Sequence, residues 1–334
     1  METNYIRKIL AKLIKDNRGM ERFFSAMVFA LVIMVSVLMY RLYSWRTYIY
    51  PATPESELPK FVQIFPGTLP SIENGYYHLR ITLPGDIKMP VYAFKVTNEK
   101  VILSADGRVV TSEYLPIPQS DFPESASICI AATSNLDVND CVEFLSGEFK
   151  DDRANFKMVE LMLDDAKGAF QLATPTDGDN LINERSGVWF GDISENTSRL
   201  NLPTLPMGWV YEGWAVVDNQ PLTTGRFKDT NSADSLSTFS SLKAESPSFP
   251  GEDFLFDPPI QVFPEQVFPV DLAGQIINIS VEPDIAGKDP TGSSPFPINI
   301  LTARVPSRPQ TGTLFSMRAV ESGFEAAVVI RIGE

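Results

Sequence analysis

An uninterrupted apolar segment near the N-terminus limits what this chain can be. Residues 23–40, FFSAMVFALVIMVSVLMY, contain no charged residue, no proline and no glycine. At about 1.5 Å per residue, a helix of this length reaches roughly 27 Å, close to the hydrocarbon thickness of a bilayer. Backbone polar groups in lipid must bond within the segment, so we predict a transmembrane helix over residues 23–45.

The charges that flank this segment predict its orientation. Only Arg41 and Arg46 follow it closely, whereas six basic residues precede it: Arg7, Lys8, Lys12, Lys15, Arg18 and Arg22. The excess on the N-terminal side predicts a single-pass protein of the cytoplasmic membrane, with its N-terminus inside and residues 47–334 exported. A cleaved signal peptide is the alternative, but RLYSWRTYIY follows the apolar run in place of a small-residue cleavage site.

Residues 1–22 form a basic cytoplasmic segment. Within it, residues 4–15, NYIRKILAKLIK, place isoleucine and leucine on one helical face and lysine and arginine on the other. This pattern predicts an amphipathic helix suited to the anionic inner leaflet of the bilayer. Two alternatives stay open, a topology signal alone or a docking helix for a cytoplasmic partner.

The exported part is acidic. The chain has a net charge of −14, and eight of its 28 basic residues but only three of its 42 acidic residues lie in the first 46 positions. Such a surface is repelled by nucleic acid and by anionic lipid, so we expect no nucleic-acid partner. His78 is the only histidine, which leaves almost nothing for a histidine-based metal site or catalytic triad. We therefore expect no catalytic residues, no metal and no cofactor.

The rest of the chain predicts an all-β protein. Residues 46–58 contain repeated prolines and indicate an extended linker. Beyond them, short alternating apolar runs recur between Pro, Gly, Asn and Asp. We predict two tandem immunoglobulin-like β-sandwich units, residues 59–166 and 167–334, with the boundary near Ala166. The C-terminal run GFEAAVVIRI is expected to close the second unit's sheet.

An internal repeat supports this division. The first copy contains Leu83-Pro84, then PVYAF at residues 90–94, then Gly107-Arg108. The second contains Leu202-Pro203, then WVYEGW at residues 209–214, then Gly225-Arg226-Phe227. This alignment matches Tyr92 with Tyr211.

The spacing of the aromatic residues predicts a difference between the copies. Tyr211 and Trp214 lie three apart, so strict alternation would put them on opposite faces of a strand. A bulge at Gly213 would turn both rings inward. Tyr92 and Phe94 lie two apart, so we expect a regular strand in the first copy. Without the bulge, one ring of the second copy would face solvent or a partner.

Two cysteines lie in the exported part, Cys129 and Cys141. They flank two strand-like runs joined by a polar turn, and exported proteins retain disulfides. A cross-strand bridge is one interpretation, and two buried free thiols are the other.

The second copy resembles a known family. The segments ATPTDGD, SGVWF, FPGEDFL and INISVEP, together with the WVYEGW and GRF runs, resemble the extracytoplasmic C-terminal domain of anti-sigma-K factors over residues 168–305. The most specific positions are Tyr211, Glu212, Gly213, Trp214, Gly225, Arg226, Phe227, Glu282 and Pro283. The resemblance implies an exported β-domain on one membrane span. The inner segment is too short for a sigma-binding helical domain and has no His-x3-Cys-x2-Cys motif, so we do not expect direct sigma-factor binding.

Other candidate sites have simpler interpretations. Asp177-Gly178-Asp179 with Glu184 could ligate calcium, but the spacing favours a glycine turn. Gly251-Glu252-Asp253 is expected in an ordered surface loop, and Trp189 in the core or in a ligand groove. We expect a sensory or regulatory ectodomain with an envelope or membrane protein partner. The alternative is an adhesion or scaffold protein of the cell envelope.

Overall fold

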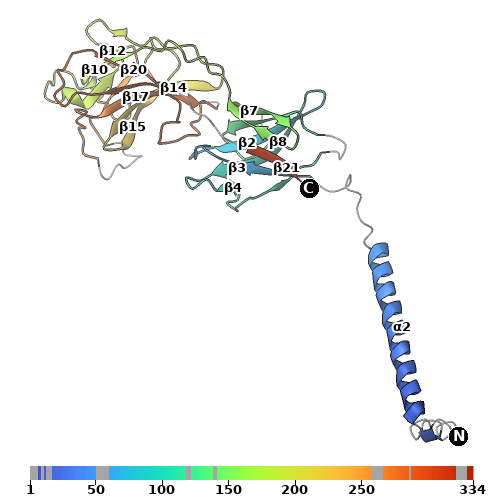
Figure 1. Cartoon of the computed structure of the whole chain (residues 1–334). Helices are drawn as coiled ribbons and strands as arrows, with labels where there is room; N and C mark the ends of the chain where they lie inside the picture. The colour runs from blue at the N-terminus through green and yellow to red at the C-terminus, as the bar shows by residue number, and fades with distance from the viewer. Residues whose placement is uncertain are drawn as a thin grey trace. The chain divides into compact units, whose positions relative to one another are not determined.

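The structure is a computed structural model. It describes residues 7–8, 11–12, 17–49, 60–117, 122–137, 141–257, 266–285, 287–320 and 329–333. The chain divides into two compact units, Met1–Leu58 and Pro59–Glu334. The first contains a long helix, and the second is built from β-sheets (Figure 1).

Helix α2 runs from Asn17 to Ile49. Its segment Phe24–Arg41 has a mean hydropathy of 2.0 and is long and apolar enough to cross a membrane. The helix extends beyond the predicted span at both ends and includes the first residues of the predicted linker, while residues 50–59 lie outside the described residues. Of the predicted amphipathic helix, Arg7, Lys8, Ala11 and Lys12 are described, and all four are helical.

The β-part begins with a 10-stranded sheet in the order β4-β3-β2-β6-β7-β8-β21-β1-β5, with β9 paired to β7. Its strands are β1 Phe61–Phe65, β2 Tyr76–Leu83, β3 Ile87–Val96, β4 Ile102–Ser104, β5 Glu113–Tyr114, β6 Ser125–Ala131, β7 Cys141–Lys150, β8 Arg153–Asn155, β9 Lys157–Met158 and β21 Val329–Gly333. The long strand β7 pairs with β6 along its first part and with β8 at its end, so it joins the two halves of this sheet.

Strand β21 corrects a prediction. The C-terminal run was expected to close the second sheet, but β21 pairs antiparallel with β1 and β8 of the first, with Phe61 opposite Gly333. Its apolar pattern specifies a strand without specifying its neighbours. Everything from β10 to β20 is therefore inserted between two strands of the first sheet.

The inserted segment forms three further sheets. One has four strands in the order β16-β11-β10-β19, and β12 pairs with β13. The third has five strands in the order β15-β14-β17-β18-β20. The bounds are β10 Ala169–Leu172, β11 Gly187–Trp189, β12 Gly191–Asp192, β13 Thr197–Ser198, β14 Trp209–Val217, β15 Gln220–Phe227, β16 Gly251–Asp253, β17 Ile276–Pro283, β18 Asn299–Arg304, β19 Phe315–Ser316 and β20 Arg318–Ala319, with short 3₁₀ helices η2 Pro175–Asp177 and η3 Glu184–Ser186.

A four-strand motif occurs twice. We call β3-β2-β6-β7 the first motif and β15-β14-β17-β18 the second motif. Tyr77 of β2 lies opposite Phe94 and Ile130, as Tyr211 of β14 lies opposite Phe227 and Val281. The pairing shifts register two residues after each tyrosine, at Leu79/Arg80 and at Gly213/Trp214. The second shifts also correspond, at Ile128/Cys129 and at Ile279/Ser280.

Side-chain contacts confirm that Tyr77 and Tyr211 are equivalent. The Tyr77 ring lies 5.6 Å from that of Phe94, and the Tyr211 ring lies 5.8 Å from that of Phe227. Each tyrosine hydroxyl donates to the backbone oxygen of a preceding proline, Pro70 in the first motif and Pro203 in the second. The sequence alignment, which matched Tyr92 with Tyr211, was therefore wrong by one strand.

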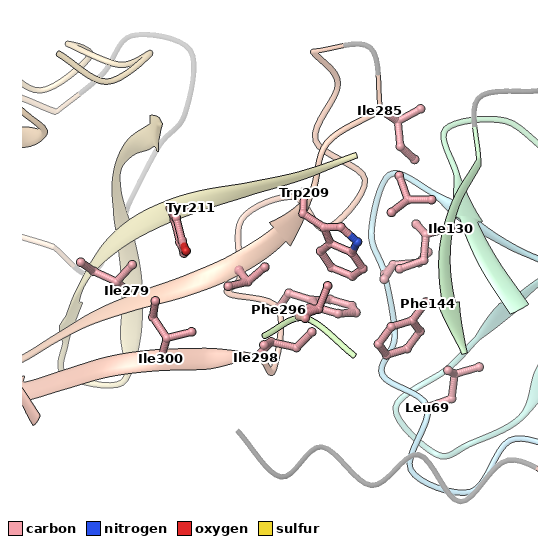
Figure 2. Packing of buried hydrophobic residues seen from close by; sticks show 14 of the residues in the cluster. Leu69, Ile130, Phe144, Trp209, Tyr211, Ile279, Ile285, Phe296, Ile298 and Ile300 are labelled. Atoms are coloured by element: carbon pink, nitrogen blue, oxygen red, sulfur yellow. The ribbon is translucent and has the colours of Figure 1, made fainter. Parts of the chain in front are cut away.

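The cores of the two motifs are continuous. Phe144 of β7 lies 5.2 Å from Phe296 and 6.4 Å from Trp209, measured between ring centroids (Figure 2). Gly208 has φ of +91°, and a Cβ there would lie 2.8 Å from the Val142 side chain. This close approach requires glycine and packs the start of β14 against β7.

Candidate functional site

The candidate site lies on one face of the second motif. Strand β14 alternates, so its residues belong to two faces. Trp209, Tyr211 and Ala215 belong to the hydrophobic core, and we call the opposite side the outer face. Glu212 and Trp214 lie on the outer face, opposite Ser280 and Asn278 of β17. Both faces are covered, since Glu212 is 3% and Trp214 is 1% exposed.

This arrangement corrects the predicted bulge. Tyr211 and Trp214 are both buried, but on opposite faces, because β14 pairs with β17 without a shift. The extra residue is Thr224 of β15, which lies between the partners of Gly213 and Trp214. The next residue, Gly225, has φ of +118°, a conformation that favours glycine. The first motif is not regular either, because Val91 of β3 is the equivalent extra residue.

A carboxylate network occupies the outer face. One oxygen of Glu282 accepts hydrogen bonds from the Ser280 hydroxyl and, at 2.8 Å, from the Phe296 backbone N–H. The other accepts from the Thr291 hydroxyl at 2.9 Å. The Trp214 indole N–H donates to the Ser280 hydroxyl at 2.8 Å, so the tryptophan, the serine and Glu282 form a chain.

Arg226 links the remaining signature residues. Its Nε lies 3.6 Å from Glu212 Oε2, and its Nη2 donates to the Pro283 backbone oxygen at 2.6 Å. Glu212 Oε1 accepts from the Thr223 hydroxyl at 2.5 Å. The polar signature residues thus lie in two neighbouring groups of contacts on the outer face, one around Glu282 and one around Glu212 and Arg226, while Tyr211 and Phe227 pack in the core. A Cβ at Gly213 would collide with the Phe190 ring, which explains the glycine.

The loop between β17 and β18, described at residues 284–285 and 287–298, covers this network. Thr291 and Phe296 of the loop bind Glu282. The same loop contacts the segment before β2: the Asn74 N–H donates to the Pro290 oxygen at 2.9 Å, and Glu73 Oε2 accepts from Ser293. Glu282 therefore holds a loop that joins the second motif to residues 73–75.

Burial raises the pKa of both carboxylates. The pKa of Glu212 rises to about 8, first through burial and then through the charges of Glu282 and Asp289. Burial raises the pKa of Glu282 to about 7, although three hydrogen bonds act in the opposite direction. Both groups therefore titrate near neutral pH.

A second buried carboxylate cluster lies on and beside β16. Asp253 accepts from the Trp189 indole at 2.7 Å and from the Thr176 N–H at 2.9 Å, and Glu252 accepts from the Ser240 hydroxyl. Asp234 accepts from the Gly251 N–H at 2.8 Å. Burial raises the pKa of Glu252 to about 8, of Asp234 to about 7 and of Asp253 to about 6. The predicted surface loop at residues 251–253 was wrong, because these residues are a buried strand.

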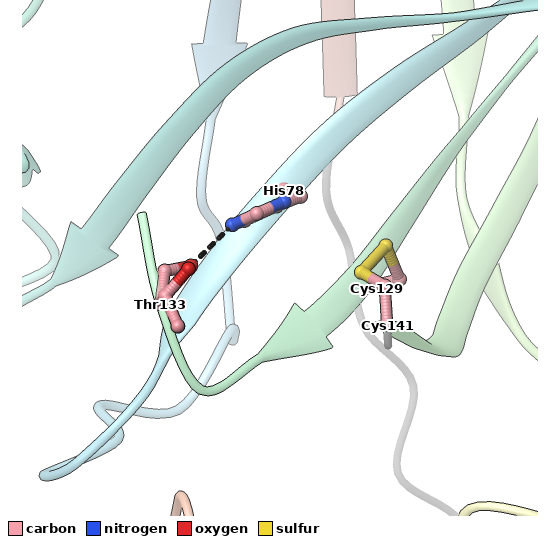
Figure 3. Close-up of a disulfide and its surroundings, with 4 residues drawn as sticks. All are labelled: His78, Cys129, Thr133 and Cys141. Carbon is pink, nitrogen blue, oxygen red and sulfur yellow. Dashed lines mark hydrogen bonds between the residues drawn. A yellow bond between two sulfur atoms is a disulfide. The ribbon is translucent and has the colours of Figure 1, made fainter. Parts of the chain in front are cut away.

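The remaining sequence candidates have structural contacts. Asp177 accepts from the amides of Asn180 and Asn183, and Glu184 accepts from the Thr174 N–H. Among the described residues, no group of three or more His, Cys, Asp or Glu side chains is arranged to hold a metal ion. Cys129 and Cys141 form a disulfide between β6 and β7 (Figure 3).

A cavity of about 320 Å³ opens beside the carboxylate network. We call it the junction cavity, because Glu73 and Asn74 line it together with residues of the inserted segment. The other lining residues are Glu212, Trp214, Pro221, Thr223, Asp289, Gly292 and Ser293. Sequence reasoning missed this site, since Glu73 and Asp289 lie in loops far from the signature strands.

Comparison with protein-family models, with curated proteins and with solved structures finds no match.

Proposed function

We propose that this protein is a membrane-anchored, non-catalytic sensory or regulatory protein that acts through protein–protein contacts, with a bilayer and an envelope or membrane protein as partners. One observation supports this most directly. Glu282 bonds to Thr291, and the same loop bonds to residues 73–74, so contacts of one loop connect both motifs. A ligand or partner bound at this junction would affect both motifs together.

The finer architecture is part of the proposal. We infer two immunoglobulin-like sandwich units, with residues 1–22 inside the cell and residues 47–334 outside. The resemblance of residues 168–305 to the outer domain of anti-sigma-K factors supports a signalling role. Direct sigma-factor binding is not part of the proposal.

The polar chemistry of the described residues favours binding over catalysis. Ser280 is fully buried and donates to a carboxylate, so its hydroxyl is neither accessible nor paired with a histidine base. His78 is buried in the first motif and bonds to a backbone oxygen.

Protease protection and cross-linking test the proposal. Protease added to intact cells is expected to digest the large β-part; digestion only after lysis would overturn the orientation. Cross-linking in intact membranes, with photoreactive groups at Asn74 and at Lys8, is expected to capture an outer partner at Asn74. Phe144→Ala should weaken that capture, and an exposed change such as Asp151→Asn should not. If the Phe144→Ala variant captures the partner as well as the unchanged protein does, partner binding does not depend on the packing between the two motifs.

One observation favours the alternative, an envelope adhesion or scaffold protein. Ile182 is 96% and Leu242 is 94% exposed, on loops that flank the Thr176 region. Apolar side chains this exposed suit a binding surface. Ile182→Ser with Leu242→Ser would abolish cell or surface attachment under the adhesion model and leave regulation unchanged.

A further inference from the structure

Another cavity, of about 470 Å³, lies beside β18 and β20 of the five-stranded sheet. Its lining residues are Ile276, Thr302, Ala303, Arg304, Ser316 and Arg318. Because these described residues include two arginines and no acidic residue, we call it the arginine cavity. Strand β20 pairs with β18 at Leu301 and Thr302, whereas the preceding strand, β19, pairs with β10 of another sheet. The chain therefore leaves β18 beside Arg304, and the cavity opens there.

The two arginines are neighbours on the outer face of the second motif. Thr302 of β18 lies opposite Arg318 of β20, and its other partner is Asn278 of β17. Asn278 in turn lies opposite Trp214, which belongs to the outer face. Arg304 follows Thr302 by two residues, so the two side chains leave the same face of β18. Arg304 and Arg318 are therefore diagonal neighbours on adjacent strands, with Cα atoms about 7–8 Å apart.

No described residue neutralises this pair of charges. Four other arginines each pair with a carboxylate: Arg108, Arg185, Arg199 and Arg226. Arg304 and Arg318 are both exposed and form no ion pair within the described residues, although acidic residues outnumber basic ones in residues 47–334. Like charges at neighbouring positions of a sheet are destabilising. An anion between the two guanidinium groups would remove this repulsion.

The chemistry of the cavity suits an anion with two carboxylates. Arg304 Nη1 donates to the Gly274 backbone oxygen at 2.6 Å, which anchors one side of its guanidinium and leaves the other donors for a ligand. A guanidinium matches the geometry of a carboxylate with two parallel hydrogen bonds, so two arginines suit two carboxylates. Ile276 is half-buried opposite Arg304 and offers apolar surface for a short methylene chain, which a hydrated inorganic anion would not use.

The charge of the surrounding protein favours a small anion over a polymer. The Debye length at physiological ionic strength is about 8 Å, so a ligand inside the cavity is attracted mainly by the two arginines. A long polyanion would extend beyond them over an acidic surface and be repelled. A volume of about 470 Å³ is in the size range of small-ligand sites.

We propose that the arginine cavity binds a small aliphatic dicarboxylate, with one carboxylate on Arg304, the other on Arg318 and the methylene chain against Ile276. This inference goes beyond the proposed function, because it adds a small-molecule site that does not depend on a partner captured at Asn74.

Titration calorimetry of the full-length protein in nanodiscs of neutral lipid tests the site, with glutarate as the probe. Arg304→Gln and Arg318→Gln are each expected to weaken binding by about tenfold or more, because each removes a charge-assisted pair of hydrogen bonds. Arg318→Lys keeps the charge without the planar fork and should weaken binding less than Arg318→Gln. Arg153→Gln is the matched control, because it removes an exposed arginine of β8 outside the cavity.

Two further ligands test the contact with both arginines. Valerate has as many carbon atoms as glutarate but one carboxylate, so it should bind about tenfold more weakly or worse. Equal binding of valerate, or inorganic phosphate binding as tightly as glutarate, would overturn the dicarboxylate site. Equal weakening by Arg153→Gln would reduce the effect to diffuse attraction and also overturn it. If Arg304→Gln impairs folding, Arg318→Gln still decides, because Arg318 is exposed on a two-residue edge strand.

Discussion

The first and second motifs share strand order, register shifts and the tyrosine–phenylalanine pair, yet their outer faces differ in chemistry. Where the second motif has Glu212 opposite Ser280, the first has His78 opposite Cys129. In the first motif the loop after β6 is held by the Cys129–Cys141 bridge and by a 2.7 Å hydrogen bond from His78 Nε2 to the Thr133 oxygen (Figure 3). In the second, the corresponding loop is held by carboxylates.

The two motifs have equivalent backbones but should respond to different chemical conditions. A covalent bridge fixes its loop at any pH and responds to reductant, whereas a buried carboxylate network responds to protonation. The first motif therefore contains the group that responds to reductant, and the second contains Glu212 and Glu282, whose pKa values burial raises to about 8 and about 7.

The largest expected effect is a difference in the free energy of unfolding between changes on the outer faces of the two motifs. Trp214→Ala should lower the free energy of unfolding by about 3–5 kcal/mol, because a fully buried ring and its hydrogen bond to Ser280 are lost. The equivalent first-motif change, Arg80→Ala, should cost about 1 kcal/mol. Urea unfolding of both variants measures this, and equal costs would argue against a difference between the two outer faces.

Reduction should act on the first motif alone. Loss of the Cys129–Cys141 bridge, which closes a loop with a sequence separation of 12, should lower stability by roughly 2–4 kcal/mol. Thermal unfolding with and without dithiothreitol measures the effect, and the Cys129→Ala/Cys141→Ala variant should be insensitive to reductant. Thiol titration of denatured, unreduced protein should find no free thiol. Two reactive thiols would show that the Cys129–Cys141 bridge does not form.

The pH dependence of stability should have opposite signs in the first motif and in the inserted segment. Glu212, Glu282 and the β16 cluster have raised pKa values, so the folded state holds protons that the unfolded chain releases. Their stabilisation is complete below the unfolded pKa, near 4, and is lost as the pH rises toward 8. Burial lowers the pKa of His78, so its contribution increases as the pH rises toward 6.5.

The carboxylates are more numerous, so the melting temperature should fall by several degrees between pH 5 and pH 8. Glu282→Gln should flatten this slope, since glutamine does not ionise, and Asp151→Asn should leave it unchanged. A melting temperature that rises over this interval would show that the buried carboxylates are ionised at little cost.

The smallest effect should be the same in both motifs. Tyr77→Phe and Tyr211→Phe each remove a hydroxyl that donates to a proline backbone oxygen, at 2.9 Å and 2.6 Å. Each should cost about 0.5–1.5 kcal/mol, the net value of one such hydrogen bond. If the two costs differ by more than about 1 kcal/mol, the two hydrogen bonds contribute differently to stability although the strand register around them is the same.

Local patterns predicted the local structure well. The apolar segment predicted a helix long enough to span a membrane, and the alternating runs predicted a mostly β fold with several sheets. Partners distant in sequence were not predicted. Tyr92 matched Tyr211 in its neighbouring residues, but the cross-strand partner that defines equivalence belongs to Tyr77.

The buried carboxylates were missed for a related reason. Glu252 and Asp253 are charged and follow a proline-rich stretch, which is typical of a loop. Their burial depends on donors that come from Thr176, Trp189 and Ser240, none of them adjacent in the sequence. Carboxylates such as these are buried where hydrogen-bond donors from other segments meet them, and the residue pattern along one strand does not show which donors those are.

The position of β21 has a consequence for the order of assembly. Strand β1 is the first of the described strands to be synthesised and β21 is the last, yet they lie side by side, with β21 filling the gap between β1 and β8. Until residues 329–333 arrive, β1 and β8 have unpaired edges while the whole inserted segment is still being made. Contacts at such sequence separation form slowly, and open edges invite wrong pairing. The nascent chain should therefore need protection by a holding chaperone for longer than its individual sheets would suggest.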